Sequence, residues 1–160
     1  MVETDDLEAD AEMNRFLQRN ALDQMKKGVS RTFILRDDQG ENQNRVLGYY
    51  STSVAHLMPD DIPNVVSPRM TIPILLLLRL AIDREFQGRR FGSKLFIYVL
   101  HQLVRLAKET AIYAFVLEPL NEHVRGFYEK FGLLPLPGDP TRLYIRVREV
   151  ETWLNEFSRQ

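Results

Sequence analysis

The sequence predicts a single domain of the mixed α/β or α+β class. Its 160 residues are the length of one ordinary domain and are sufficient for a substantial core. A hydrophobic content of 44% and a charged content of 27% are typical of a globular protein. Apolar runs typical of strands alternate with apolar patterns of helical period through most of the chain. This mixture of elements indicates the fold class.

The first half of the chain is predicted to form one helix and two strands. Apolar residues recur at helical spacing at Met13, Phe16, Leu17, Ala21 and Met25. Gly28 stands where that helix should end. The stretches "SRTFILRDD" and "RVLGYYSTSVA" predict strands joined by the turn "DDQGENQN". Four prolines follow in "MPDDIPNVVSPRMTIP", which we expect to be mostly loop.

The second half predicts alternating strands and helices. In order, these are a strand over 74–82, a helix over 91–110, a strand at "AIYAFVLEP", a helix over 120–131 ending at Gly132, and a strand at "TRLYIRVR". A terminal helix is indicated by an apolar face at i, i+3, i+4 and i+7, formed by Val150, Trp153, Leu154 and Phe157.

Composition excludes several kinds of chemistry. The chain has no cysteine, so disulfides and thiolate catalysis are excluded, which suits a reducing cytoplasm. The start "MVETDDLEADAE" has neither the basic nor the apolar region of a signal peptide. The most apolar stretch, "IPILLLLRLAI", is interrupted by Pro73 and Arg79 and is shorter than the roughly 20 residues of a membrane span. We therefore expect a cytoplasmic protein without membrane association.

Charge is distributed unevenly. Six of the 22 acidic residues lie in residues 1–12, which contain no Lys or Arg. The rest of the chain holds 21 basic against 16 acidic residues, an excess of five positive charges. A basic body favours a polyanionic partner, although a solvated surface behind an acidic, frayed end explains the same charges. The predicted organisation is an acidic N-terminus over 1–12, a main domain over 13–148 and an amphipathic helix over 149–160.

The stretch "FQGRRFGSKLF" places glycines and cations between a strand and a helix. The first backbone N–H groups of a helix lack intrahelical partners and lie at the positive end of its dipole, so they can bind an anion. Gly88 and Gly92 would let a ligand approach the backbone, and Arg84, Arg89 and Arg90 add positive charge. A plain turn and a phosphate-binding loop both remain open from this stretch alone.

The stretch "NEHVRGFYEKFG" is the second candidate. Leu120, Val124, Phe127 and Phe131 form the inward stripe of the predicted helix. Tyr128 lies about 100° round the helix from Phe127, so its hydroxyl need not be buried in that stripe. A phenol there can act as a general acid, or its ring can pack at the margin of the core. His56, His101 and His123 are scattered without the spacing of metal ligands, so no metal site is predicted.

These two stretches together resemble the GNAT superfamily of N-acetyltransferases. That family binds acetyl-coenzyme A through a motif [QR]-x-x-G-x-[GA] after its fourth strand, and "QGRRFG" matches its first and last positions. The resemblance implies a GNAT fold, with a mixed central sheet flanked by helices, and acetyl-coenzyme A as cosubstrate. Its coenzyme-binding residues would be Leu80, Ala81, Ile82, Gln87, Gly88, Arg89, Arg90, Phe91, Gly92, Ser93 and Asn121.

Arg90 departs from the family motif, because glycine is usual at that position. If the backbone there needs a positive φ, arginine costs about 1 kcal/mol or more. If it does not, Arg90 is free to pair with a coenzyme phosphate. The resemblance also implies that Asn121 contacts the coenzyme and that Tyr128 protonates the departing thiolate. Backbone N–H groups around Leu80 to Ile82 would polarise the thioester carbonyl.

A narrower resemblance covers nearly the whole chain. The stretches "LLLRLAIDREFQG" and "FYEKFGLLPLPGDPTRLYI" resemble the GNAT toxins of bacterial toxin–antitoxin pairs. This resemblance implies acetylation of the α-amino group of aminoacyl-tRNA, which blocks translation. It also implies inhibition by a ribbon-helix-helix antitoxin. The sequence leaves open whether the protein forms a homodimer. The alternatives are a GNAT enzyme for a small amine or a protein N-terminus, and a non-catalytic module that binds acyl-coenzyme A.

Three further residues are candidates for contact with substrate or RNA. Arg79 interrupts an apolar strand, where it can serve a structural ion pair or bind the acceptor end of the RNA. Arg84 follows the same strand and is a candidate for the RNA face. Tyr49 lies in "YYS", which can line an acceptor pocket, although aromatic residues in strands often serve packing.

Overall fold

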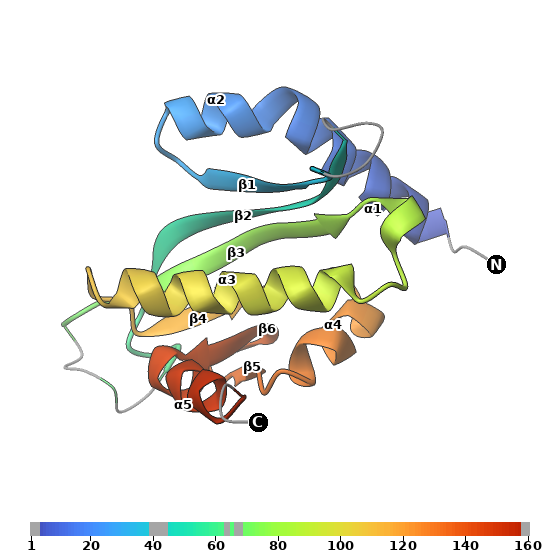
Figure 1. Ribbon diagram of the computed structural model, residues 1–160. Coiled ribbons are helices and arrows are strands. Elements are labelled where there is room, and N and C mark those ends of the chain that lie inside the picture. Colours follow the sequence, from blue (N-terminus) through green and yellow to red (C-terminus); the bar gives the residue numbers. More distant parts are fainter. Residues whose placement is uncertain (1–3, 39–44, 63–64, 66–68, 158–160) are drawn as a thin grey trace. The chain divides into compact units, whose positions relative to one another are not determined.

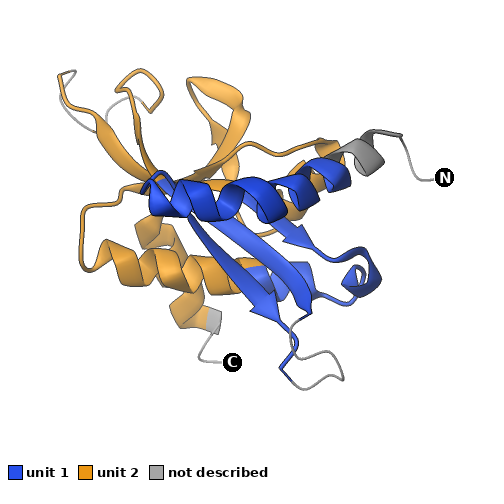
Figure 2. Ribbon diagram, turned by 90° about the horizontal axis from the view of Figure 1, so that it is seen from above, with its two compact units in different colours: residues 1–53, 79–95 blue, residues 54–78, 96–160 orange. Residues whose placement is uncertain are grey.

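The computed structural model describes residues 4–38, 45–62, 65 and 69–157 (Figure 1). Its contacts divide the chain into two compact units, residues 1–53 with 79–95 and residues 54–78 with 96–160 (Figure 2). The helical elements are α1 Thr4–Arg15, the π-helical turn η1 Phe16–Asn20, α2 Ala21–Lys26, the 3₁₀ turn η2 Arg84–Phe86, α3 Phe91–Ala107, α4 Glu122–Glu129 and α5 Val147–Phe157. The strands are β1 Arg31–Arg36, β2 Val46–Leu57, β3 Ile72–Ile82, β4 Ala114–Leu117, β5 Leu134–Leu136 and β6 Asp139–Arg146.

The strands form a mixed six-stranded sheet in the order β1-β2-β3-β4-β6-β5. β1 pairs antiparallel with β2, from Arg31 opposite Thr52 to Arg36 opposite Val46. β3 and β4 are parallel, whereas β4 pairs with β6 and β5 pairs with β6 in the antiparallel sense. This mixed sheet confirms the predicted fold class.

The first unit contains α1, η1 and α2. Phe16, Ala21 and Tyr49 are buried together, with Met13, Leu17 and Ala81 packed against them. The helix predicted from Met13 in fact begins nine residues earlier, at Thr4. Residues 4–12 contain few large apolar residues, so the apolar period could not indicate this part of the helix. Gly28 has a φ of 71° just after α2, which confirms the predicted helix end.

The second unit holds most of the buried core. Leu57, Ile72, Ile74, Ala114, Val116 and Leu136 are among its buried members. α5 begins at Val147, directly after β6, and Val150 and Leu154 are buried. The strand β5 was missed by the sequence analysis, because three residues between Gly132 and Gly138 are too few to show a period.

Several sequence predictions fall partly outside the described residues. These are positions 39–44 of the turn after β1, positions 63–64 and 66–68 of the proline-rich loop, and the ends at 1–3 and 158–160. Leu120 was expected in an inward stripe, but it lies before α4 and is 56% exposed. That helix begins only at Glu122, so the apolar period was extended too far toward its N-terminus.

Candidate active site

The end of β3 extends beyond its pairing with β4. Pairing of β3 with β4 ends at Leu77 opposite Leu117, whereas β3 continues for five residues to Ile82. Beyond the strand, the Asp83 side chain caps η2 by accepting a hydrogen bond from the Glu85 N–H at 2.9 Å. The backbone at Leu80, Ala81 and Ile82 is therefore beyond the β3–β4 ladder, as a role in polarising a carbonyl requires.

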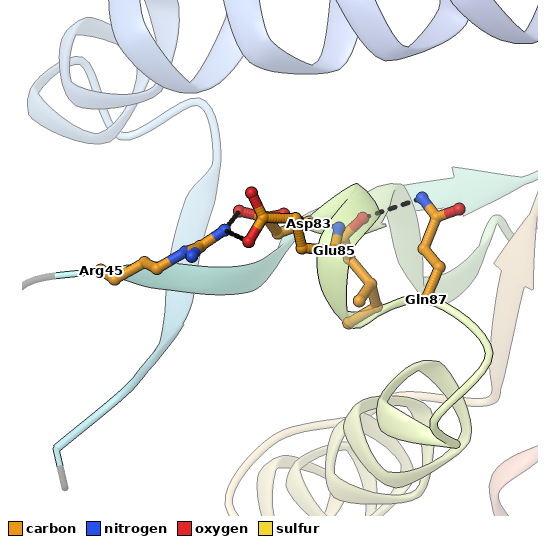
Figure 3. A network of polar contacts seen from close by, with 5 residues as sticks. Arg45, Asp83, Glu85 and Gln87 are labelled. Atoms are coloured by element: carbon orange, nitrogen blue, oxygen red, sulfur yellow. Dashed lines mark hydrogen bonds and ion pairs between the residues drawn. The ribbon is translucent and has the colours of Figure 1, made fainter. Parts of the chain in front are cut away.

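An ion-pair network braces the turn between β3 and α3 (Figure 3). Arg45 Nη2 lies 3.1 Å from Asp83 Oδ2 and 2.8 Å from Glu85 Oε2. Gln87 Nε2 donates to the carbonyl of Ile82 at 3.0 Å. The pKa of Asp83 is lowered, mainly by the Glu85 N–H and further by Arg45. Sequence reasoning missed Arg45, since 38 residues separate it from Asp83.

The start of α3 provides free backbone donors. Lys94 N–H bonds to the Arg90 carbonyl at 3.1 Å, whereas the N–H groups of Phe91, Gly92 and Ser93 have no acceptor within the described parts of the chain. A Cβ built on Gly92 meets only Ile82 Cγ1, at 3.8 Å, which is ordinary contact. The fold therefore has room for a side chain at Gly92, and the open space above the donors suits a ligand.

Arg90 adopts the left-handed conformation, which is the first of the two alternatives left open by the sequence. Its φ is 63°, and that of Gly88 is 74°. The left-handed region costs a residue with a Cβ roughly 1–2 kcal/mol. Arg89 instead stacks over Phe86, with its guanidinium 5.4 Å from the ring centre. The turn keeps the backbone shape of the glycine motif, and Arg90 has no ion-pair partner among the described side chains.

Tyr49 faces a cavity of about 460 Å³ in the first unit. Its hydroxyl donates to the Met13 carbonyl at 2.9 Å, and its ring stacks on Phe16 at 6.1 Å between centres. Burial raises the pKa of Tyr49 to about 12, and nearby Glu12 also raises it, while Arg79 lowers it. The Tyr49 ring packs in the core and also lines this cavity, and a role of the cavity as an acceptor pocket stays a proposal.

The two candidate RNA-binding arginines lie against α1. Arg79 Nη2 is 3.2 Å from Glu12 Oε1, and its guanidinium lies 4.1 Å from the centre of the Phe16 ring. Arg84 forms an ion pair with Asp10. Of the two alternatives for Arg79, a structural ion pair or contact with RNA, the structure shows the ion pair. The acidic segment at the N-terminus supplies both partners.

Tyr128 lies in an aromatic cluster of the second unit. Its ring centre is 5.0 Å from that of Phe96 and 5.0 Å from that of Phe127. The side chain is only 6% exposed, more buried than the sequence indicated, because Phe96 of α3 covers it. Burial raises the pKa of Tyr128 well above its usual value. Its hydroxyl donates a hydrogen bond to no described residue.

Asn121 is the N-cap of α4. Its Oδ1 accepts a hydrogen bond from the Val124 N–H at 2.9 Å. This bond satisfies one of the unpaired N–H groups of the first turn and stabilises the helix that carries Tyr128.

In the part of the chain that the structure describes, no three His, Asp or Glu side chains gather as metal ligands. Within the same residues, no helix is long and apolar enough to cross a membrane.

A family model described as the acetyltransferase (GNAT) family matches residues 4–133. The chain belongs to the GNAT acetyltransferase family. The match begins inside the acidic segment and includes parts of both compact units, which agrees with the predicted single domain. The predicted GNAT fold and acetyltransferase class are confirmed.

Within the GNAT family, this chain is similar to a curated toxin and to solved structures of toxins. A "tRNA-acetylating toxin" of Mycobacterium tuberculosis (strain ATCC 25618 / H37Rv) is 29% identical over 146 residues, which are 90% of this chain and 85% of that protein. The structure of AtaT complexed with acetyl-methionyl-tRNAfMet has a TM-score of 0.80 at 26% identity, covering 90% of this chain and 86% of AtaT. AtaTR bound with acetyl-coenzyme A has a TM-score of 0.75 at 26% identity, covering 89% of this chain and 83% of that one.

These similarities confirm the resemblance to GNAT toxins. They also confirm acetyl-coenzyme A as cosubstrate at the level of the family, since the AtaTR structure contains it. The roles of the turn residues, Asn121, Tyr128, Arg79 and Arg84 in binding or catalysis are proposals.

Proposed function

We propose that this protein transfers the acetyl group of acetyl-coenzyme A to the α-amino group of aminoacyl-tRNA, as a translation-blocking toxin. The observation that carries the proposal is the relation to a tRNA-acetylating toxin over 90% of this chain. The fold also matches AtaT, which was solved with an acetylated, charged tRNA. We assign the reaction to the cytoplasm, where charged tRNA is used.

The coenzyme pyrophosphate is proposed to bind at the turn over residues 87–93. The free N–H groups of Phe91, Gly92 and Ser93 supply donors at the positive end of the α3 dipole. Gln87 contributes by holding the turn against the carbonyl of Ile82, and Gly88 by its positive φ. Although its backbone has a positive φ, the exposed Arg90 side chain has no ion-pair partner among the described residues, and we propose that it pairs with a phosphate. The exposed Arg89 adds charge above Phe86.

The proposed reaction is a direct attack of the amine on the thioester. The amine nitrogen forms a bond to the carbonyl carbon, and backbone N–H groups at Leu80, Ala81 and Ile82 stabilise the oxyanion. The carbon–sulfur bond then breaks, Tyr128 gives its proton to the leaving sulfur, and the amine loses its extra proton to water. Tyr128 regains a proton from water before the next turnover. An α-amino group has a pKa near 8, so a neutral fraction exists at physiological pH without a strong base.

The tRNA and the antitoxin are the proposed macromolecular partners. Arg79 and Arg84 lie on the end of β3 and in η2, and we propose that they bind phosphates near the acceptor end. A protein antitoxin is supported by relatives solved with one, such as AtaT with the C-terminus of AtaR. We further propose that the antitoxin is of the ribbon-helix-helix class, which co-purification with the product of a neighbouring reading frame would test. We also propose a homodimer, which light scattering would test.

Transfer of labelled acetyl from acetyl-coenzyme A tests the proposed function. The substrates are charged tRNA, the same tRNA without its amino acid, and a small amine or peptide. We expect label on charged tRNA alone, because only it carries both the amine and the RNA. Label on the small amine or peptide, with none on charged tRNA, would identify a different GNAT enzyme.

A further inference from the structure

Gly48 of β2 lies against the end of β3, where a side chain does not fit. A Cβ built on Gly48 lies 2.7 Å from the Ala81 carbonyl oxygen and 2.6 Å from Ile82 Cδ1, whereas ordinary contact begins at 3.4 Å. The φ of Gly48 is not positive, so its conformation is open to other residues. Glycine inside a strand often marks the close approach of another backbone, and here the reason for glycine is space.

The two contacts differ in how easily they can give way. Ile82 Cδ1 is the end of a flexible side chain, which a change of rotamer can move aside. The Ala81 oxygen belongs to the backbone, and the Asp83 N–H donates to the Leu47 carbonyl at 2.8 Å, which holds this stretch of β3 beside β2. A Cβ at position 48 would have to move the Ala81 oxygen from 2.7 Å to the 3.4 Å of ordinary contact, a relative displacement of about 0.7 Å.

The same peptide group carries an N–H that is proposed to polarise the thioester carbonyl. Backbone groups of alternate residues point to the same edge of a strand. The Asp83 N–H donates toward β2, and the Ala81 oxygen faces Gly48 on that edge. The Ile82 N–H therefore points to the opposite edge, where pairing with β4 has ended at Leu77. Because a peptide group is planar, displacement of the Ala81 oxygen moves the Ile82 N–H with it.

We propose that Gly48 is a positioning residue for acetyl transfer, because its missing side chain lets the Ala81–Ile82 peptide place the Ile82 N–H against the thioester oxygen. The proposal rests on the proposed function, since it deepens the role given there to the end of β3. Loss of one oxyanion donor costs about 10²–10³ in kcat, and misplacement by about 1 Å costs up to about 10²-fold. A Cβ at position 48 should therefore slow the chemical step and leave the coenzyme bound.

Infrared spectroscopy of bound acetyl-coenzyme A with ¹³C in its carbonyl measures the polarisation directly. In the wild type, we expect the carbonyl stretch at a lower frequency than in free acetyl-coenzyme A, and in Gly48→Ala a smaller shift. A full shift in a folded Gly48→Ala variant would overturn the proposal. Absence of any shift in the wild type would also overturn it, because Gly48 would then have no polarisation to set.

This measurement needs no amine, so it separates the role of Gly48 from the identity of the substrate. If the wild type does not acetylate charged tRNA, the proposed function fails, and the infrared shifts still decide the role of Gly48. If charged tRNA is acetylated and the shift is full in Gly48→Ala, the role of Gly48 fails and the proposed function stands.

Kinetics distinguish positioning from a merely structural role. In folded Gly48→Ala, we expect kcat to fall about tenfold or more, with little change in the Kd for acetyl-coenzyme A. Gly126→Ala is the matched control, since a Cβ on Gly126 meets nothing within 4 Å, and it should keep the wild-type kcat and carbonyl frequency. A higher Kd with an unchanged kcat in Gly48→Ala would overturn the proposal, because Gly48 would then act only on coenzyme binding.

A second background keeps the test decisive if Gly48→Ala alone does not fold. Ile82→Val removes Cδ1, so that Gly48→Ala combined with Ile82→Val retains only the close contact with the Ala81 oxygen. The double variant is compared with Ile82→Val alone, and we expect a smaller carbonyl shift in the double variant. Equal shifts in the two would overturn the proposal, because the Ala81–Ile82 peptide would then not respond to a Cβ at position 48.

Discussion

Glu12 of α1 neutralises Arg79 of β3, with Oε1 and Nη2 3.2 Å apart. The Arg79 side chain is 25% exposed and that of Glu12 is 65% exposed. A phosphate that approaches Arg79 therefore competes with a carboxylate that the chain itself supplies. Arg84 and Asp10 repeat the arrangement a few residues away. The acidic N-terminal segment thus contacts both arginines proposed for RNA binding.

Replacement of Glu12 by glutamine should strengthen tRNA binding. Arg79 loses its carboxylate partner and becomes available to phosphate, and the side-chain volume hardly changes. We expect a roughly twofold to fivefold lower Kd for charged tRNA at low salt and a steeper dependence on salt. The Kd for acetyl-coenzyme A should stay the same.

Asp23→Asn is the matched control for Glu12→Gln. It removes the same charge from the exposed Asp23–Lys27 pair of α2, which has no proposed role. Equal effects of the two substitutions on tRNA binding would show that net charge alone acts, and would contradict a specific role of Arg79.

Replacement of Arg90 by glycine tests whether the Arg90 side chain binds the coenzyme, without changing the backbone of the turn. Glycine readily adopts the observed φ of 63°, so the loop should keep its shape. We expect the Kd for acetyl-coenzyme A to rise about threefold to tenfold, the effect of losing one exposed charge-assisted contact. Isothermal titration calorimetry measures this Kd, and Lys108→Ala, at an exposed cation directly after α3, is the control of equal charge. Unchanged or tighter binding by Arg90→Gly would assign Arg90 no contact with phosphate.

A graded series at Gly92 tests the backbone approach of the coenzyme. The structure leaves room for a side chain there, so Gly92→Ala and Gly92→Val should both fold. Binding of acetyl-coenzyme A should weaken with side-chain size, because the Cβ substituents occupy the space above the free N–H groups of α3. A folded Gly92→Val variant with wild-type affinity would exclude the turn as the pyrophosphate site.

Tyr128→Phe should separate chemistry from binding. The ring contacts with Phe96 and Phe127 persist, while the proton donor is lost. We expect kcat to fall about 10²-fold or more, with little change in the Kd for acetyl-coenzyme A. A wild-type kcat in this variant would show that Tyr128 only packs in the aromatic cluster.

The pH dependence of the wild-type rate also tests Tyr128 as the general acid. Burial raises the pKa of Tyr128 above its usual value near 10, so the phenol stays protonated through pH 9. The rate should therefore rise between pH 6 and 9 as the amine loses its proton, with no alkaline decline in that window. A decline centred below pH 9 would contradict a protonated, buried Tyr128 as the acid.

Much of the site could be predicted from local sequence, and the rest depends on long-range contacts. Gly132 follows α4 with a φ of 86°, as expected for a glycine after a helix end, whereas the positive φ of Arg90 was left open by the sequence. The partners of Arg79 and Arg84 lie 67 and 74 residues away, so no local pattern could reveal them. The burial of Tyr128 depends on Phe96 of another helix, which a single helical period does not report.

Mass spectrometry of the RNA product is the most direct test of the central claim. Charged tRNA is incubated with the protein and acetyl-coenzyme A and then digested with nuclease, so that the terminal aminoacyl-adenosine is released. We predict a gain of one acetyl group on the α-amino nitrogen of the aminoacyl-adenosine, dependent on Tyr128 and absent from uncharged tRNA. An unmodified aminoacyl-adenosine, in a reaction where the same preparation acetylates a free amine or peptide, would contradict the account.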